Sequence, residues 1–257
     1  MIIDCHVHFP AERCVYRREE VDRCLALADR AGIDRLVYLF NTADSGGVDP
    51  TPDDIRRNND LGMELTTRHP DRFAAFCYLN PAHDVALLEA EMDRCLVAGP
   101  CIGIKLWISV HADDERLDPI MRRAAALGVP VLHHAWYKAT EFAYNESTPA
   151  EIATLARRHP DVTIIMAHLA GGGVRGVLDV RDCPNVLVDT SGAQPMAGLV
   201  SYAVEQLGPD RVVFGSDWPI RDFAVQRARV DGADLTDEVR AKIMGGTMQR
   251  VLEEARR

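Results

Sequence analysis

The chain opens with MIIDCHVHF (residues 1–9), an apolar run that carries two histidines, His6 and His8, near its end. The apolar residues predict a buried strand, because strands covered on both faces of a parallel sheet are almost continuously apolar. Side chains two positions apart in a strand lie on one face, so both imidazoles are expected close enough to bind one ion. This stretch therefore predicts a parallel sheet with two possible metal-binding histidines at the end of its first strand.

The same kind of apolar run recurs along the whole chain. The expected strands cover residues 1–9, 34–40, 72–80, 101–107, 130–136, 162–170, 185–191 and 211–218. Helical patterns separate them, and several end at a glycine (Gly32, Gly99, Gly128), the residue that commonly follows the last turn of a helix. Eight strands, each followed by a helix, predict an α/β fold, a (β/α)8 TIM barrel. No linker or low-complexity segment interrupts it, so residues 1–257 are expected to form one domain.

Composition and charge narrow the class of partner. The 257 residues are 47% hydrophobic and 26% charged, which is enough to bury a sizeable core in a soluble protein. A net charge of −10 would repel a phosphate backbone, so nucleic acid is not expected. No apolar run approaches the roughly 20 residues of a membrane span, and no basic segment with an apolar signal core precedes the first strand. We expect a cytoplasmic protein with a small-molecule substrate and no membrane partner; a homo-oligomer stays open.

Polar residues gather at the carboxyl ends of the expected strands, where the active sites of barrels lie. Beyond the first strand these residues are Lys105, His133, His134, His168, Asp189 and Asp217. Imidazole nitrogens and a carboxylate oxygen, with one position left for water, make a typical catalytic metal shell. One pair of strand histidines alone is more often a packing feature, but recurrence at successive strand ends predicts a metal site. Alternation alone does not choose between His133 and His134.

Five motifs together resemble the amidohydrolase superfamily. They are DCHVH (4–8), GIKLW (103–107), PVLHHAW (130–136), MAHLAGG (166–172) and FGSDWP (214–219). More closely, they are similar to the amidohydrolase-2 branch, which includes aminocarboxymuconate-semialdehyde decarboxylase. RHPDRFAAFCYLNP (68–81) is similar to the segment of that branch that leads into the third strand. The resemblance runs from the first strand to the eighth and implies a metal-dependent barrel, while it says much less about the substrate.

The resemblance implies a role for each matching position. His6 and His8 would be the first ligand pair, and His134 the ligand from the fifth strand. His168 would orient water or polarise the substrate. Asp217 would bind the metal and shuttle a proton. The expected cofactor is a divalent metal, with zinc as the first choice.

Lys105 leaves the number of metal ions open. Within the superfamily a lysine on the fourth strand can be carbamylated and bridge two metals, with the histidines of the fifth and sixth strands on the second ion. The branch that the chain most resembles usually holds one metal, and there a lysine would bind a substrate carboxylate or phosphate. We expect one ion, with two as the alternative if Lys105 is carbamylated.

Substrate contacts are expected from the loops around the mouth of the barrel. The loop WYKATEFAYNES (136–147) offers Trp136, Tyr137 and Lys138 as a wall, although a loop that merely packs on the barrel would have the same composition. Arg175, in GGGVRG (171–176), is available for a substrate anion, and Asp189 stands at the end of the seventh strand. The glycines also satisfy GxGxxG, but the short helix that follows and the late position argue against a dinucleotide site.

The expected activity is hydrolysis of a small amide or lactone. The metal would lower the pKa of its bound water toward about 7. Asp217 would accept the proton of the water and return it to the leaving group, while His168 polarises the carbonyl. The alternative is metal-dependent, non-oxidative decarboxylation of an aromatic or muconate-type acid, in which the metal and His168 assist protonation of a ring carbon. A barrel that keeps its ligands but only binds or scaffolds is the non-enzymatic alternative.

Overall fold

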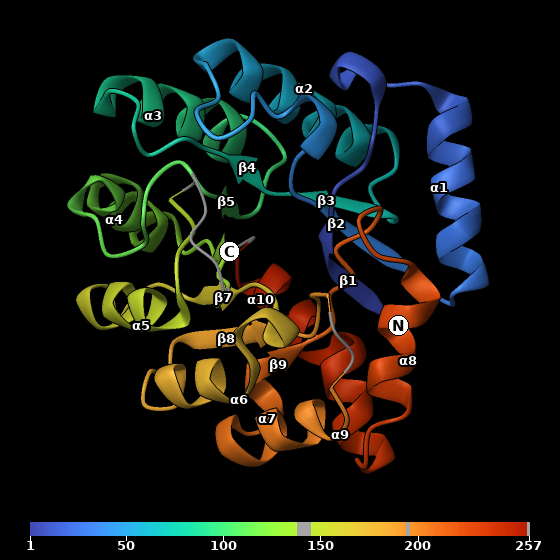
Figure 1. Cartoon of the computed structure of the whole chain (residues 1–257). Coiled ribbons are helices and arrows are strands. Elements are labelled where there is room, and N and C mark those ends of the chain that lie inside the picture. The colour runs from blue at the N-terminus through green and yellow to red at the C-terminus, as the bar shows by residue number, and fades with distance from the viewer. Residues whose placement is uncertain (138–144, 194–195, 256–257) are drawn as a thin grey trace.

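Short parallel strands surround a central axis in the computed structural model, which describes residues 1–137, 145–193 and 196–255 (Figure 1). The strands are β1 (Ile3–Val7), β2 (Arg35–Tyr38), β3 (Phe73–Ala75), β4 (Cys77–Tyr78), β5 (Ile104–Leu106), β6 (Val131–His133), β7 (Ile164–Met166), β8 (Val186–Asp189) and β9 (Val212–Val213). Each lies inside one of the eight predicted runs, and the run at 72–80 contains two of them.

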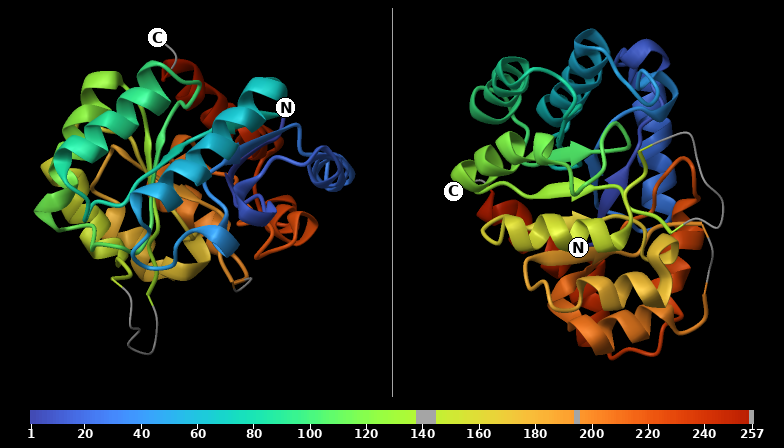
Figure 2. Two further views of the ribbon diagram at one scale, coloured as in Figure 1. Left: turned by 90° about the horizontal axis from the view of Figure 1, so that it is seen from above. Right: turned by 60° about the vertical axis from the view of Figure 1, so that its left-hand side comes forward.

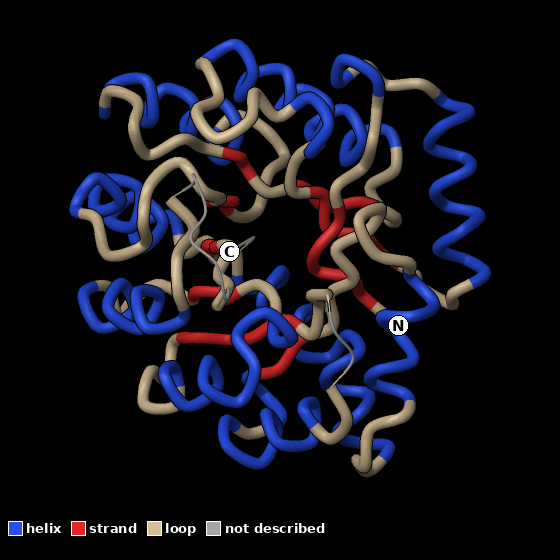
Figure 3. The backbone as a smooth tube through the Cα atoms, in the orientation of Figure 1, coloured by secondary structure: helices blue, strands red, loops and turns tan. Residues whose placement is uncertain are grey.

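Helices form an outer ring around these strands (Figures 2 and 3). They are α1 (Arg18–Arg30), α2 (Pro52–Arg68), α3 (Val85–Met92), α4 (Asp118–Leu127), α5 (Pro149–Arg158), α6 (Leu169–Val180), α7 (Leu199–Leu207), α8 (Phe223–Asp231), α9 (Asp237–Ala241) and α10 (Thr247–Glu254). Two of them, α2 and α5, begin with a capping box and a proline in the first turn, a combination that satisfies the free N–H groups of the helix start. None of the helices in the described ranges has both the length and the apolarity to cross a bilayer.

The strands pair in chain order, with every pairing parallel, as β1-β2-β3 and as β4 through β9. The break falls at Phe76, where the chain passes from one neighbour to the other. The Phe76 N–H donates to the Tyr38 carbonyl of β2 at 3.0 Å, and the Cys77 N–H donates to the Gly103 carbonyl before β5 at 2.7 Å. The two sheets are therefore one curved wall that is interrupted at a single residue.

The wall closes between β1 and the segment around β9. The Cys5 N–H donates to the Phe214 carbonyl at 3.0 Å, and Val7 forms a parallel bridge with Trp218. Closure leaves no free sheet edge, which together with the outer helices confirms the predicted (β/α)8 TIM barrel.

Two layers of apolar side chains hold the barrel together. The inner layer contains alternate residues of successive strands, among them Val37, Leu39, Ala74, Leu132, Ile165, Leu187 and Val213. Met248, Val251 and Leu252 of α10 belong to the same layer, so this helix closes the end of the barrel opposite the strand ends that carry the polar residues. The outer layer packs the remaining strand residues against the helices.

β1 changes phase within its five residues. Ile3 and Cys5 belong to the inner layer, but Val7 belongs to the outer one, and the pairing with β2 shifts register between Asp4 and Val7. A bulge of this kind inserts a residue and re-aims the side chains that follow it. The histidines on either side of Val7 are thereby turned toward the inside of the barrel mouth.

We expect Ile165→Ala to lower the free energy of unfolding by about 2–5 kcal/mol, because Ile165 is fully buried in the inner layer and the neighbouring side chains can fill only part of the space. Urea unfolding followed by circular dichroism measures the change. Val225→Ala, on the exposed side of α8, is the control and should stay within about 0.5 kcal/mol of the parent. Equal losses in the two variants would contradict the assignment of the inner layer.

Candidate metal centre

β1 and the segment after β9 bring three donor groups together at the mouth of the barrel. The Nε2 atoms of His6 and His8 lie 3.0 Å apart. Asp217 Oδ1 lies 3.6 Å from the Nε2 of His6 and 3.4 Å from that of His8. All three side chains are buried, and their donor atoms are close enough together to hold one metal ion.

Hydrogen bonds behind the two histidines determine which ring nitrogens face inward. His6 Nδ1 lies 2.7 Å from Asp189 Oδ2, and His8 Nδ1 lies 3.0 Å from the Phe40 carbonyl oxygen. A carboxylate and a carbonyl only accept, so each Nδ1 donates and each Nε2 keeps its lone pair. Two lone pairs and a carboxylate oxygen then face one another, which is repulsive unless a cation lies between them. This donor set fits a divalent metal.

Asp189 supports two histidines at once. Besides accepting from His6, it uses Oδ1 to accept the backbone N–H of His168 at 3.0 Å and that of Ser191 at 2.9 Å, together with the Ser191 hydroxyl. Ser191 Oγ lies 2.8 Å from His168 Nδ1 and accepts a hydrogen bond from it. Burial acts to raise the pKa of Asp189, but the interaction with His6, which donates a hydrogen bond to it, holds that pKa below its usual range. The carboxylate is therefore ionised and fully engaged.

His134 and His168 form a second pair beside the first group. His134 Nδ1 lies 3.1 Å from His168 Nε2, and His134 Nε2 lies 2.6 Å from Glu146 Oε1. Because His168 Nδ1 donates to Ser191 and His134 Nε2 donates to Glu146, the facing nitrogens need a shared proton or a cation between them. The structure thus places His134 against His168, and the group of His6, His8 and Asp217 does not include it. The ligand role of His134 stays a prediction.

Two of these residues have strained backbones. His168 has a φ of 69° and Asp217 a φ of 66°, in the left-handed region that side-chain-bearing residues seldom adopt. The conformation of His168 lets its carbonyl accept the N–H groups of Gly171 and Gly172 at the start of α6. The Asp217 N–H donates to the His6 carbonyl at 2.8 Å, which ties the segment after β9 to β1. At these two positions the strain occurs in residues whose side chains line the cavity, whereas Arg13 and Cys14 have positive φ outside it.

Burial keeps the imidazoles neutral near pH 7. It lowers the pKa of His8 to about 4, although the neighbouring Asp217 carboxylate, which can accept a hydrogen bond from the protonated ring, acts to raise it. It also lowers the pKa of His134 and moves that of His168 well below its usual value. Lys105 is 1% exposed, and burial lowers its pKa to about 8, with the charges of two nearby aspartates opposing the shift.

A cavity of about 300 Å³ opens onto these groups. His8, His134, His168 and Asp217 line it, together with Lys105, Trp107, Trp136, Glu146 and Arg221. The Trp136 ring lies 5.2 Å from the His168 ring and stacks on that of His134 at 6.5 Å; its contact with substrate stays a prediction. His133 does not line the cavity; its Nδ1 contacts the His134 carbonyl at 2.7 Å, so the structure distinguishes the two neighbours.

Three residues predicted to contact substrate lie elsewhere. The Tyr137 hydroxyl donates to Asp179 at 2.6 Å, and the Arg175 guanidinium lies 4.4 Å above the Tyr137 ring, so these two pair with each other away from the cavity. Asp189 lies behind His6 and is fully buried. None of the three is among the described residues that line the cavity, so direct substrate contact does not fit their placement. Lys138 falls outside the described residues.

Glu146, Trp107 and Arg221 are cavity residues that the sequence did not single out. Glu146 belongs to the quoted loop after the fifth strand, but only its contact with His134 identifies it. Trp107 follows Lys105 by two positions, so strand alternation could have placed it on the same side. Arg221 lies four residues after Asp217 in a segment without regular pattern, and no signal in the sequence would have found it.

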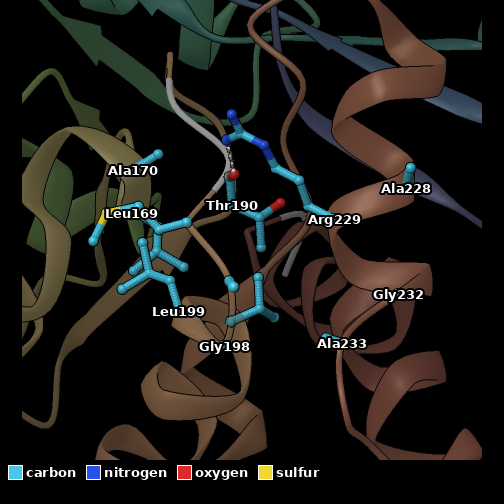
Figure 4. Close-up of a pocket in the computed structure, with 12 residues that line it drawn as sticks. Leu169, Ala170, Thr190, Gly198, Leu199, Ala228, Arg229, Gly232 and Ala233 are labelled. Atoms are coloured by element: carbon cyan, nitrogen blue, oxygen red, sulfur yellow. Dashed lines mark hydrogen bonds between the residues drawn. The ribbon is translucent and has the colours of Figure 1, made fainter.

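A second cavity, of about 310 Å³, lies between the starts of α6 and α7 and one side of α8 (Figure 4). Its wall is mostly apolar, with Leu169, Leu199, Ala228 and Ala233 among the residues drawn, and Arg229 supplies its charge. None of the described residues that line it could ligate a metal through an imidazole, thiol or carboxylate. We therefore place the chemistry in the first cavity.

Comparison with known proteins agrees with this architecture. The amidohydrolase family matches residues 3–253, essentially the whole described chain. The chain belongs to the amidohydrolase family. Among curated members of known activity, gamma-resorcylate decarboxylase from Polaromonas sp. (strain JS666) is 24% identical to it, over 90% of this chain and 87% of that protein.

Solved structures similar to this chain include two aromatic acid decarboxylases. The 5-carboxyvanillate decarboxylase of Sphingomonas paucimobilis superimposes with a TM-score of 0.79 at 17% identity, covering 98% of both chains. The dihydroxybenzoic acid decarboxylase of Polaromonas sp. JS666, with bound manganese and 2-nitroresorcinol, gives a TM-score of 0.79 at 20% identity, over 98% of this chain and 96% of that one. At these identities the likeness shows the barrel fold of the amidohydrolases.

We expect Asp189→Asn to weaken metal binding about 10- to 100-fold, because an amide cannot accept from His6 and from the His168 and Ser191 N–H groups at once. Competition with a chromogenic chelator measures the affinity. Asp179→Asn, which removes the carboxylate that accepts from Tyr137 outside the cavity, is the matched control and should bind metal like the parent. Unchanged affinity in Asp189→Asn would contradict the role of Asp189.

The metal-free protein should lose stability as the pH falls from about 6.5 toward 5. His8, with a pKa of about 4, and His133, with a pKa of about 3, stay neutral when folded, whereas an unfolded chain protonates them near pH 6.5. The unfolded state then binds more protons, so acid favours it. Asp4, whose burial raises its pKa to about 7, contributes the opposite slope, so Asp4→Asn should steepen the fall. Urea unfolding at several pH values measures both slopes, and stability that rises with acid would contradict the assignment.

Proposed function

We propose that the chain is a metal-dependent, non-oxidative decarboxylase of an aromatic acid. The observation that carries the proposal is the alignment with gamma-resorcylate decarboxylases over 90% and 85% of the chain. These relatives favour the activity that the sequence offered as the alternative, and they replace hydrolysis of an amide or lactone as the leading hypothesis. The arrangement of His6, His8, Asp217 and His168 at one mouth supports it, since it combines a metal-type donor set with a separate proton carrier.

His6, His8 and Asp217 would hold the metal, with His134 as the further candidate ligand. A divalent ion bound there supplies a Lewis acid for a carboxylate or phenolic oxygen of the substrate. Manganese takes the place of zinc as the first metal to test, because it is the ion in the similar decarboxylase structure. Asp189 and the Phe40 carbonyl orient the two histidines from behind.

The reaction replaces a carbon–carbon bond by a carbon–hydrogen bond. The ring carbon must receive a proton, and the electron pair of the bond to the carboxylate stays on the ring as carbon dioxide leaves. His168 would deliver this proton; its position on the cavity wall and its contact with His134 through facing nitrogens support this role. The pair can share a proton that neither buried imidazole would hold alone, and the Glu146 carboxylate compensates its charge.

Lys105 provides a cation for the substrate carboxylate. Its ammonium is buried at the cavity, and a pKa of about 8 leaves it mostly protonated at neutral pH. The alternative, a carbamylated Lys105 between two metals, predicts two ions per chain. Metal content after reconstitution distinguishes the two, since a substrate-binding lysine leaves the stoichiometry at one.

We expect the manganese-reconstituted protein to release carbon dioxide from 2,6-dihydroxybenzoate or a related aromatic acid. The measurement couples carbon dioxide release to loss of the acid, with a lactone and an amide assayed in parallel on the same metal-counted sample. Hydrolysis of the lactone or amide without carbon dioxide release from any aromatic acid would reject decarboxylation and restore the hydrolase.

His168→Ala should lower turnover by about 10²–10⁴-fold while the metal content stays at the parent level, because the residue carries a proton and does not belong to the group of His6, His8 and Asp217. The atoms of His6, His168 and Asp189 also lie close together, but hydrogen bonds between His6 Nδ1 and Asp189 and between His168 Nδ1 and Ser191 engage them. His6→Ala should lose the metal as well as the activity. His111→Ala, a half-buried histidine that contacts Glu151 away from the cavity, is the control and should keep both. Metal retained in His6→Ala would show that the ligands are assigned wrongly.

A further inference from the structure

Arg221 is a cation in the catalytic cavity that no described carboxylate neutralises. It lies in the segment after β9, on the wall that also carries Asp217. Its Nη1 donates to the Ile220 carbonyl at 2.9 Å, while its Nε is buried and has no hydrogen-bond partner. A buried donor without an acceptor is unfavourable, so an acceptor brought by a ligand would relieve it.

Two side chains of α8, Arg229 and Gln226, also have a buried polar atom without a hydrogen-bond partner. Arg229 Nη1 donates to the Thr190 carbonyl at 3.4 Å (Figure 4), and its Nε is buried without a partner. Gln226 is 1% exposed; its Nε2 donates to the Gly192 carbonyl at 3.2 Å, and its Oε1 has no partner. Both side chains thus contact the segment that directly follows Asp189 at the end of β8.

The two guanidinium groups also repel each other. Burial lowers the pKa of Arg229, and the charge of Arg221 lowers it further, so the two are near enough to interact. Guanidinium groups remain protonated in proteins, and the repulsion is therefore permanent. Arg94, by contrast, pairs with Glu91 and Asp60, whereas Arg211 and Arg240 lie outside the cavity and donate to backbone carbonyls. A cationic pair left without a carboxylate partner at a cavity is the arrangement expected of an anion-binding site.

We propose that Arg221, supported by Arg229, binds a second carboxylate of the substrate, so that the acid this protein takes is a dicarboxylate. The inference rests on the proposed function, in which the reacting carboxylate lies by Lys105 and the group of His6, His8 and Asp217. Arg221 lines the same cavity as Lys105, His8 and Asp217, and the planar fork of a guanidinium matches a carboxylate. Arg229 does not line this cavity among the described residues; it is a positioning residue that adds positive potential behind Arg221.

Calorimetric titration of the manganese-loaded protein with benzoate and with isophthalate, its 1,3-dicarboxylate analogue, tests the proposal. Isophthalate should bind at least tenfold more tightly than benzoate. R221Q should reduce this preference below threefold while the benzoate affinity changes less than twofold, and R221K should restore part of the preference. R229Q should give an intermediate preference. R250Q, on the exposed side of α10 where Arg250 contacts Glu254, is the control and should behave like the parent.

Equal affinity for the two acids in the parent, no isophthalate binding at all, or a preference that survives R221Q would each overturn the proposal. An equal loss for both acids in R221Q would also overturn it, because Arg221 would then contact the carboxylate that both share. The readout is binding rather than turnover. A dicarboxylate preference that depends on Arg221 in a protein that releases no carbon dioxide would keep this subsite and reject the decarboxylase.

Discussion

The hydrogen bond between Asp189 and His6 is the contact on which the site depends. It joins the end of β8 to β1 across the barrel mouth, and it turns His6 so that Nε2 faces His8 and Asp217. The same carboxylate also holds the His168 N–H and, through Ser191, the His168 ring. The buried Asp189 carboxylate thus orients both His6, a candidate metal ligand, and His168, the proposed proton donor. A change at Asp189 would therefore disturb the proposed metal site and the proposed proton transfer together.

The closed barrel makes this convergence possible, because closure places β1 beside the segment that follows β9. The site draws on the first strand, the residues after the last strand and four strands between them, which only a closed wall brings to one rim. Water is largely excluded there, so imidazoles stay neutral and a lysine stays near its titration point. The chemistry proposed for the site relies on both effects.

The sequence predicted the barrel because the eight apolar runs and the helical segments between them recur along the whole chain. This alternation identifies a parallel barrel even where the exact strand ends are misjudged. The sequence also predicted that His6, His8, His168 and Asp217 would meet, since all four stand at strand ends. It could not predict the bulge in β1, which depends on register with β2, or the turning of His134 toward His168 and Glu146. Tyr137 and Arg175 looked like substrate contacts because both were expected near the mouth, yet Arg175 lies within α6, and Tyr137 packs on Arg175 and donates to Asp179 of the same helix.

The left-handed backbones of His168 and Asp217 have a consequence for how this protein can change over time. Glycine adopts that conformation without strain, so selection for folding alone would favour glycine at both positions. Glycine at either position would relieve the backbone strain, but it would also remove an imidazole or a carboxylate from the cavity. At these two positions the stability of the fold and the chemical equipment of the site therefore make opposite demands on the residue.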